Sequence, residues 1–259
     1  MTQNALVTGA ARGIGRAIAL RLAKDGLNVA VNDTKANASE LEQTRQEIEQ
    51  LDRHSYSIIA DVSNDTQVEN MMRNTAQKLG SLNVAIANAG IAQVKPLLEI
   101  TTEDWDKMFA VNLRGVFLCY REAAKIMIEQ GKGGKIIGAC SIVGYKPFPM
   151  LSHYSATKWG VRGLTQAAAM QLAQYKITVN AYCPGIVGTA MWDLIDEKLA
   201  KYENKEKGKV IEEYTNKLIA LGRTSVPEDV ANFVSYLASS DSDYMTGQSV
   251  MIDGGVQFS

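Results

Sequence analysis

Hydrophobic and polar positions follow two alternating patterns along most of the chain. Short apolar runs rich in valine, isoleucine and alanine are separated by longer segments in which apolar residues recur with helical period. Such runs are typical of parallel strands covered by helices on both faces, because these strands present no polar face. The pattern therefore predicts a doubly wound α/β fold. The predicted strands are residues 4–10, 28–33, 57–62, 83–90, 134–141, 177–185 and 248–255, and the predicted helices are residues 15–26, 38–51, 68–80, 105–131 and 152–161.

The chain shows no boundary between domains. No proline-rich, glycine- and serine-rich or charged linker divides its 259 residues, and no solenoid repeat is present, so we predict one domain over residues 1–259. Residues 192–217 depart from the alternating pattern because they are densely charged. Interleaved charges are typical of solvated helices. The segment also follows a predicted strand, where ligands bind in such folds, so it is placed to form a small helical lid.

Composition limits the partners of the protein. A net charge of -1 gives no electrostatic attraction for nucleic acid or an anionic membrane. No apolar run reaches the roughly 18 residues of a membrane helix, and no signal peptide is apparent. We therefore expect a soluble, cytoplasmic protein that binds a small molecule. Its three widely spaced cysteines and two histidines form no cluster, so neither a disulfide framework nor a metal site is expected.

A glycine-rich turn joins the first predicted strand to the first predicted helix. The sequence TGAARGIG, residues 8–15, contains Gly9, Gly13 and Gly15. Backbone N–H groups and the positive end of the helix dipole at such a turn suit a pyrophosphate. The spacing is G-x-x-x-G-x-G and differs from the standard G-x-G-x-x-G dinucleotide fingerprint. Glycines that only let the helix pack on its sheet would explain the same residues.

Asp33 strengthens the interpretation of a dinucleotide site. It closes the second predicted strand, about twenty residues beyond the glycines, where a carboxylate accepts hydrogen bonds from an adenosine ribose. The same charge repels a 2′-phosphate, so NAD is favoured over NADP. Two features weaken this preference: Asp33 could instead cap the following helix, and Lys35 lies close to it in the sequence.

Tyr154 and Lys158 form a candidate proton-transfer pair. They are four residues apart in a segment of helical character, so their Cβ atoms lie on one face about 5–6 Å apart. A single pair of this kind is a weak signal. Ser141 at the end of a predicted strand and Asn112 in the sequence FAVNLRG make the interpretation stronger.

The chain resembles the short-chain dehydrogenases/reductases along its whole length. This resemblance implies a Rossmann-type fold and an NAD(P)-dependent oxidoreductase that acts on a CH–OH group. Several motifs in family order are more specific than any one of them. Ala87 stands where the family often has asparagine, which we expect to affect support of the sheet more than chemistry. The matching motifs are TGAARGIG, ADV with Asp61, ANAG, Asn112, Ser141, YSATK, PGIVGT and the DGG near the end.

The resemblance also implies the role of each site residue and a homotetrameric assembly. The catalytic residues are Asn112, Ser141, Tyr154 and Lys158. In these roles Lys158 also bonds the nicotinamide ribose, Ser141 binds the substrate oxygen, and Asn112 holds a water of a proton relay. The residues that the resemblance assigns to NAD are Gly9, Arg12, Gly13, Ile14, Gly15, Asp33, Asp61, Val62, Asn88, Gly90, Tyr154, Lys158, Pro184, Gly185, Val187 and Thr189.

The chemistry of these residue types agrees with the implied roles. A tyrosine has a pKa near 10, and burial raises it. We expect the Lys158 ammonium to stabilise the phenolate of Tyr154 and to bring this pKa toward the working range of a general acid and base. The Ser141 hydroxyl can stabilise a developing alkoxide. Cys140 and His153 should face other directions, Cys140 as a buried structural thiol and His153 outside the mechanism.

Met191 and Trp192 complete the predicted substrate pocket with Ser141. Their bulky side chains follow the turn at Val187 and Thr189, where they can close over the reacting carbon and leave room for a small substrate. Alternatively, both residues only anchor the charged segment to the core. The sequences NAYCPGIVGTAMWDLIDE and SDSDYMTGQSVMIDGG are closely similar to acetoin/diacetyl reductases that act as 2,3-butanediol dehydrogenases, but the lysine-rich KYENKEKGK departs from the bacterial relatives.

Two other functions remain open at this point. A polyol, a sugar or another carbonyl compound is the alternative substrate of the same family. A dinucleotide sensor that kept the fold without catalysis is the alternative of a different class, since fold does not fix function. Such a sensor has no need for Asn112, Ser141, Tyr154 and Lys158 together, so we predict an enzyme that transfers hydride between NAD(H) and a small alcohol or ketone.

Overall fold

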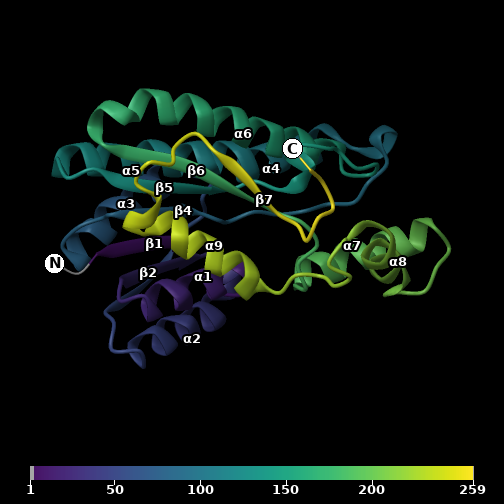
Figure 1. Ribbon diagram of the computed structural model, residues 1–259, viewed down its shortest axis with the longest axis horizontal. Helices are drawn as coiled ribbons and strands as arrows, with labels where there is room; N and C mark the ends of the chain where they lie inside the picture. The colour runs from purple at the N-terminus through teal and green to yellow at the C-terminus, as the bar shows by residue number, and fades with distance from the viewer. Residues whose placement is uncertain (1–2, 259) are drawn as a thin grey trace.

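A seven-stranded parallel sheet forms the centre of the molecule in the computed structural model, which describes residues 3–258 (Figure 1). The strands are β1 (Asn4–Thr8), β2 (Asn28–Asp33), β3 (Ser55–Ile59), β4 (Val84–Ala87), β5 (Gly134–Ala139), β6 (Ile177–Pro184) and β7 (Ser249–Ile252). Their order in the sheet is β3-β2-β1-β4-β5-β6-β7, and all neighbours are parallel. The predicted doubly wound fold is confirmed.

Helices cover both faces of the sheet, as Figure 1 shows. One layer contains α1, α2 and α9, and the other contains α3, α5 and α6. In β1, Ala5 and Val7 pack in the first layer while Leu6 packs in the second. This two-sided burial is why the strand sequences are apolar throughout. The helices are α1 (Gly13–Lys24), α2 (Ala38–Glu49), α3 (Asp65–Leu79), α4 (Thr102–Phe109), α5 (Gly115–Gln130), α6 (Ser152–Leu172), α7 (Ala190–Tyr202), α8 (Lys209–Leu218) and α9 (Pro227–Ala238).

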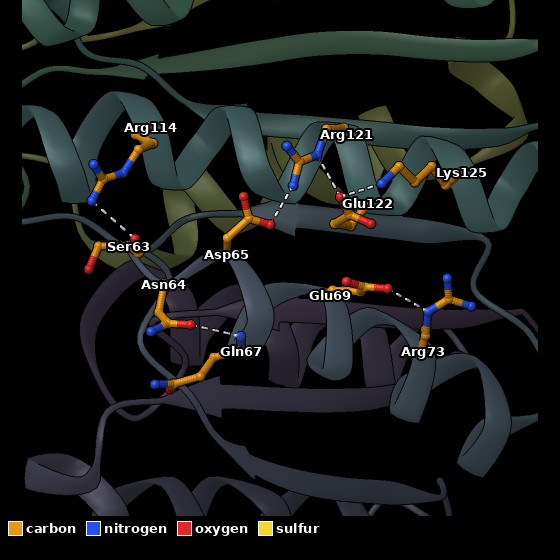
Figure 2. Close-up of polar contacts among 10 residues, drawn as sticks. All are labelled: Ser63, Asn64, Asp65, Gln67, Glu69, Arg73, Arg114, Arg121, Glu122 and Lys125. Carbon is orange, nitrogen blue, oxygen red and sulfur yellow. Dashed lines mark hydrogen bonds and ion pairs between the residues drawn. The ribbon is translucent and has the colours of Figure 1, made fainter.

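Polar contacts join α3 to α5 along their outer side (Figure 2). Arg121 of α5 pairs with Asp65 at the start of α3, with 2.6 Å between the guanidinium nitrogen and the carboxylate oxygen. Arg114 donates to the backbone carbonyl of Ser63 at 3.2 Å. These contacts are exposed, where ion pairs typically contribute less than about 1 kcal/mol each. Apolar packing beneath the helices therefore dominates the stability of this layer.

The segment predicted as one helix, residues 105–131, is interrupted by a wider turn. Helix α4 ends at Phe109, the residues Ala110–Arg114 form a π-helical turn, and α5 begins at Gly115. Hydrophobic periodicity does not reveal a single wide turn, because the apolar face continues on both sides of it. Such turns are frequent at functional sites.

Helix α9 is absent from the elements predicted by the hydrophobic pattern. Its start carries local signals: Pro227 occupies the first turn, and the Asp229 carboxylate accepts the Val226 N–H at 2.9 Å. Proline fits the first turn because its missing N–H has no helical partner there. Val230 and Val234 of α9 are fully buried in the α1 layer, and this packing holds the helix against the sheet.

The charged segment at residues 192–217 forms most of two helices, α7 and α8, with the connection at residues 203–208, and both helices project beyond one end of the sheet (Figure 1). Asp196 of α7 is buried and accepts the N–H of Ile211 at 2.9 Å and the N–H of Gly208. One carboxylate therefore holds the start of α8 against α7. Across residues 3–258, no helix has the length and apolar content that a membrane crossing requires.

The order of the strands reverses at the centre of the sheet. From β1 the chain proceeds outward through β2 to β3, and it then returns to place β4 on the other side of β1. Connections at this point leave in opposite directions, so they open a crevice at the carboxyl ends of the strands, where ligands of open α/β sheets bind.

Candidate active site

A cavity of about 890 Å³ lies at the carboxyl ends of the strands. Of the residues predicted for the site, all border this cavity except Asn112. They come from segments far apart in the sequence, including the turn after β1, the end of β2, and the connection from β6 to α7. The cavity is mostly apolar with a few convergent polar groups, which is typical of a ligand site.

The turn after β1 exposes the start of α1 to the cavity. Arg12 precedes the helix, its side chain does not cap it, and the first turn contains no acidic residue. Gly13 has a φ of +57°, a conformation that favours glycine. The first N–H groups of α1 thus have no capping side chain, and the helix dipole attracts negative charge to them. This end of the cavity fits a pyrophosphate.

Gly15 has a packing role in the same turn. A Cβ atom at this position would lie 2.1 Å from the carbonyl oxygen of Gly9 and 2.4 Å from Nδ2 of Asn88. Asn88 is itself engaged, because its amide nitrogen donates to the Thr8 carbonyl and its oxygen accepts the Tyr182 hydroxyl, both at 2.8 Å. The two explanations of the glycines therefore apply together: Gly15 permits close packing, and the packing fixes the exposed helix start.

Asp33 borders the cavity at the end of β2. Its Oδ1 accepts the Thr34 N–H and the Asn37 side-chain amide, both at 2.8 Å, and Oδ2 accepts the Ala11 N–H at 3.2 Å. Asp33 makes no cap on α2, whose N-cap residue is Asn37. The backbone of the glycine turn and the loop after β2 thus hold the carboxylate in place at the cavity wall.

Asp61 lies after β3, where its carboxylate accepts both the N–H and the hydroxyl of Ser63 at 2.8 Å. Val62 packs in the buried core beside it. Gly185 follows β6 and lies against Asp253, since a Cβ atom there would be 2.9 Å from the Cβ of Asp253. Thr189 precedes α7 and its hydroxyl donates to the Val187 carbonyl at 3.3 Å.

Tyr154, Lys158 and Ser141 lie together and border the cavity. The Lys158 Nζ atom is 5.4 Å from the centre of the Tyr154 ring and donates to the Ala139 carbonyl at 2.8 Å. Within residues 3–258 this is the only hydrogen bond of the ammonium group, which leaves two donors for a ligand. Ser141 follows β5, and its hydroxyl oxygen accepts the Val143 N–H at 3.3 Å.

The protonation behaviour of the pair differs from the expectation drawn from the residue types. Burial raises the pKa of Tyr154, and a hydrogen bond with Ser141 opposes this shift only in part. Burial also lowers the pKa of Lys158. Desolvation therefore outweighs the expected lowering of the tyrosine pKa by the lysine, because both side chains lie in a poorly solvated environment. The Tyr154 hydroxyl stays protonated at neutral pH.

Asn112 lies behind the cavity wall in the π-helical turn. Its Oδ1 accepts the Ile91 N–H at 2.9 Å and its Nδ2 donates to the Ile91 carbonyl at 2.8 Å. The amide thus holds Ile91, which borders the cavity. The proton relay through a water at Asn112 stays a prediction.

The two neighbours set apart from the mechanism are both buried. Cys140 donates its thiol to the Lys158 carbonyl at 3.3 Å and packs in the core on the α5 and α6 face. His153 is bonded to Gln93 and does not border the cavity.

The substrate end of the cavity has an apolar wall. Met191 and Trp192 of α7 border it, and they pack against the same apolar cluster as Tyr154. Phe148 and Tyr214 also border it, with their ring centres 6.4 Å apart. Sequence reasoning did not identify these two aromatic residues. The sequence KPFPML between Ser141 and Tyr154 carries a signal for Phe148, since it places an aromatic residue between prolines in a connection between two site residues.

These groups fit a nicotinamide dinucleotide. The free start of α1 suits the pyrophosphate, the carboxylate of Asp33 suits ribose hydroxyls, and the ammonium of Lys158 has donors available beside Tyr154. Residues 3–200 match the family model described as short chain dehydrogenase.

The chain belongs to the short-chain dehydrogenase family.

Relatives of this short-chain dehydrogenase cover nearly its whole length. A short-chain dehydrogenase/reductase from Armillaria gallica is 50% identical over 254 residues, covering 98% of this chain and 95% of the relative. The L-2,3-butanediol dehydrogenase of Corynebacterium glutamicum is 47% identical over 258 residues, covering 100% of both chains. The acetoin dehydrogenase from Salmonella typhimurium has 31% sequence identity to this chain. Its crystal structure matches with a TM-score of 0.86, covering 100% of this chain and 99% of that chain.

Proposed function

We propose that this short-chain dehydrogenase uses NAD(H) to interconvert a small secondary alcohol and its ketone. The observation that carries the proposal is the meeting of Tyr154, Lys158 and Ser141 inside a cavity with a free helix start at one end and an apolar wall at the other. A non-catalytic dinucleotide sensor has no use for this arrangement. The family uses nicotinamide dinucleotides, which matches the groups around the cavity.

Tyr154 acts as the general acid in ketone reduction. A tyrosine hydroxyl is protonated at neutral pH, so a proton is available for the carbonyl oxygen as negative charge develops there. The Ser141 hydroxyl donates a hydrogen bond to the same oxygen. When bound, the nicotinamide ring supplies the hydride for reduction or accepts it for oxidation. Lys158 holds the ribose with its two remaining donors and places a positive charge beside the tyrosine.

The substrate that we propose is a four-carbon ketol, diketone or diol, namely acetoin, diacetyl or 2,3-butanediol. The relatives named for butanediol and acetoin span the full chain, and this supports the assignment. The wall formed by Met191, Trp192, Phe148 and Tyr214 supports it as well, because bulky side chains from α7, α8 and the connection before α6 occupy this end of the cavity. We propose that α7 and α8 act as a lid that excludes water during hydride transfer.

We propose a homotetramer, as the family resemblance implies, and the large apolar side chains of Phe117, Trp159 and Met170 exposed on α5 and α6 support an assembly. We propose a cytoplasmic location, which the free cysteines support because thiols persist in reducing compartments.

The substrate assignment predicts an order of catalytic efficiencies. Among ketols, diketones, vicinal diols, sugar alcohols and hydroxysteroids, the four-carbon compounds should give the highest kcat/KM. Trp192→Ala should raise kcat/KM for bulkier ketones relative to acetoin by about tenfold, because loss of the indole removes part of the apolar wall and enlarges the substrate pocket. Steady-state rates followed by NADH absorbance measure both quantities.

The matched control for this experiment is Trp105→Ala, which removes a half-exposed tryptophan that lies outside the cavity. This variant should keep the wild-type ratio between bulky ketones and acetoin. A sugar alcohol or a steroid that exceeds the four-carbon compounds in the wild type would refute the substrate assignment and leave the dehydrogenase assignment intact.

Asp33 is expected to set the preference for NAD(H). Asp33→Asn keeps an oxygen that accepts from Thr34 and Asn37 and removes the charge that repels a 2′-phosphate. The variant should narrow the ratio of kcat/KM for NADH over NADPH by about tenfold or more, which corresponds to about 1.4 kcal/mol. Asp52→Asn, at an exposed position outside the cavity, should leave the ratio unchanged. A wild type that prefers NADPH would contradict the role of Asp33.

A further inference from the structure

A chain of polar contacts runs from the first turn of α6 to α4. His153 is fully buried, and its Nε2 lies 2.8 Å from Oε1 of Gln93. The Gln93 amide nitrogen donates to Oδ1 of Asp104 at 2.7 Å. The other carboxylate oxygen of Asp104 accepts from Lys95 Nζ at 2.6 Å. Four side chains thus connect the residue before Tyr154 with the loop between β4 and α4.

The Asp104 carboxylate fixes the direction of the hydrogen bonds along this series of contacts. Lys95 and Gln93 hold the pKa of Asp104 well below its usual range, so the carboxylate only accepts. Gln93 must therefore turn its nitrogen to Asp104 and its oxygen to His153. The Nε2 atom of His153 then carries the hydrogen and donates. Burial lowers the pKa of His153 and so favours the neutral ring, and Nδ1 has no partner among residues 3–258.

This polar chain holds a loop that forms part of the cavity wall. Ile91 and Ala92, directly before Gln93, border the cavity. Asn112 holds Ile91 with two hydrogen bonds, and the Lys95 N–H donates to the Met150 carbonyl at 2.9 Å. The contact at Gln93 lies between these two attachments. It joins the wall to the helix turn that carries Tyr154.

We propose that His153 is a positioning residue, which uses its hydrogen bond to Gln93 to set the wall at Ala92 relative to the Tyr154 hydroxyl. The inference rests on the proposed function, because it concerns the geometry of proton transfer to the substrate. A displacement of about 1 Å at a reacting group can lower a rate by about 100-fold, so a small movement of either element is measurable. A histidine that only fills space would be replaced by another ring with no selective effect on turnover.

Two substitutions at His153 test the proposal. His153→Phe keeps a ring and removes the donor, and we expect kcat for acetoin reduction to fall by about tenfold or more while the affinity for NADH is retained. His153→Gln places an amide nitrogen near the position of Nε2, so it should restore most of kcat. His54 is the second histidine of the chain and is exposed, so His54→Gln is the matched control and should keep wild-type rates.

Gln93→Leu tests whether the effect passes through the loop. The single variant should lose about as much kcat as His153→Phe, and the double variant should lose no more than either one, since all three break the same hydrogen bond. Amide hydrogen exchange in a peptide covering residues 88–101 should become faster in both single variants and stay unchanged in His153→Gln. Thermal unfolding of each variant separates these effects from general loss of stability.

The outcomes separate the proposal from the function on which it rests. Wild-type kcat in His153→Phe, or additive losses in the double variant, would overturn the positioning role. If the wild type turned over no carbonyl compound, the proposed function would fail. In that case, amide hydrogen exchange in residues 88–101 still tests the structural part of the proposal. Unchanged exchange in His153→Phe would show that His153 does not hold the cavity wall, and faster exchange would show that it does.

Discussion

Tyr154→Phe is expected to lower kcat in both reaction directions by about 1000-fold while NADH still binds. The substitution removes the only proton that the proposed mechanism transfers to the substrate oxygen, and general acid–base catalysis contributes roughly 100- to 10,000-fold. The ring remains and packs against the same apolar cluster as Met191 and Trp192, so the apolar wall should keep its shape. Stopped-flow or steady-state assays with acetoin, together with NADH fluorescence titration, measure the two quantities.

Tyr175→Phe is the matched control, because it removes a hydroxyl from a half-exposed tyrosine that does not border the cavity. It should keep wild-type kcat. If Tyr154→Phe retained near-normal turnover, the tyrosine would be a structural residue and another group would have to supply the proton.

Gly15→Ala is expected to have the largest effect on stability. A Cβ atom there would overlap the Gly9 carbonyl oxygen at 2.1 Å and the Asn88 amide at 2.4 Å. The Asn88 side chain cannot move freely, since it is hydrogen-bonded to Thr8 and Tyr182. Overpacking of this kind costs about 3 kcal/mol in the free energy of unfolding. Because the clash displaces the start of α1, the affinity for NADH should fall as well.

Urea denaturation and NADH titration of the same variant measure both losses. Gly163→Ala is the matched control: this glycine lies within α6, and no atom is within 4 Å of a Cβ placed there. Alanine in a helix interior is favoured over glycine by about 1 kcal/mol, so the control should be as stable as the wild type or more stable. A Gly15→Ala variant with wild-type stability and NADH affinity would show that the turn relaxes freely.

The sheet and most of its helices could be predicted because burial on both faces marks each strand in the sequence. The glycine turn, Asp33 and the Tyr154–Lys158 pair could be proposed from the residues themselves, and the family resemblance supplied most of the other site residues. All of them border one cavity except Asn112. Its role depends on a single π-helical turn, which changes the helix by one residue and leaves the hydrophobic pattern on either side intact.

The remaining differences arise from contacts between distant segments. Phe148 and Tyr214 meet across the cavity although they lie in different connections, and no local pattern predicts that pairing. The pKa of Tyr154 depends on how deeply the pair is buried, which the spacing of Tyr154 and Lys158 does not reveal. Helix α9 shows only local signals in the sequence, Pro227 and Asp229 at its start, and its burial depends on packing against the distant helix α1.

The base of the α7 and α8 excursion is closed independently of the two helices. Val187 pairs with Ser225 in a parallel bridge, the Gly188 N–H donates to the Ser225 carbonyl, and the Ser225 N–H donates to the Ile186 carbonyl, both at 2.9 Å. The chain therefore leaves and rejoins the end of the sheet at neighbouring residues, and the Leu221 N–H is held there as well by the Gly254 carbonyl at 3.0 Å. The entropy of closing a loop grows only slowly with its length. Insertions and deletions between α7 and α8 should therefore add little entropic cost to folding, since the Val187–Ser225 bridge lies at the base of the segment.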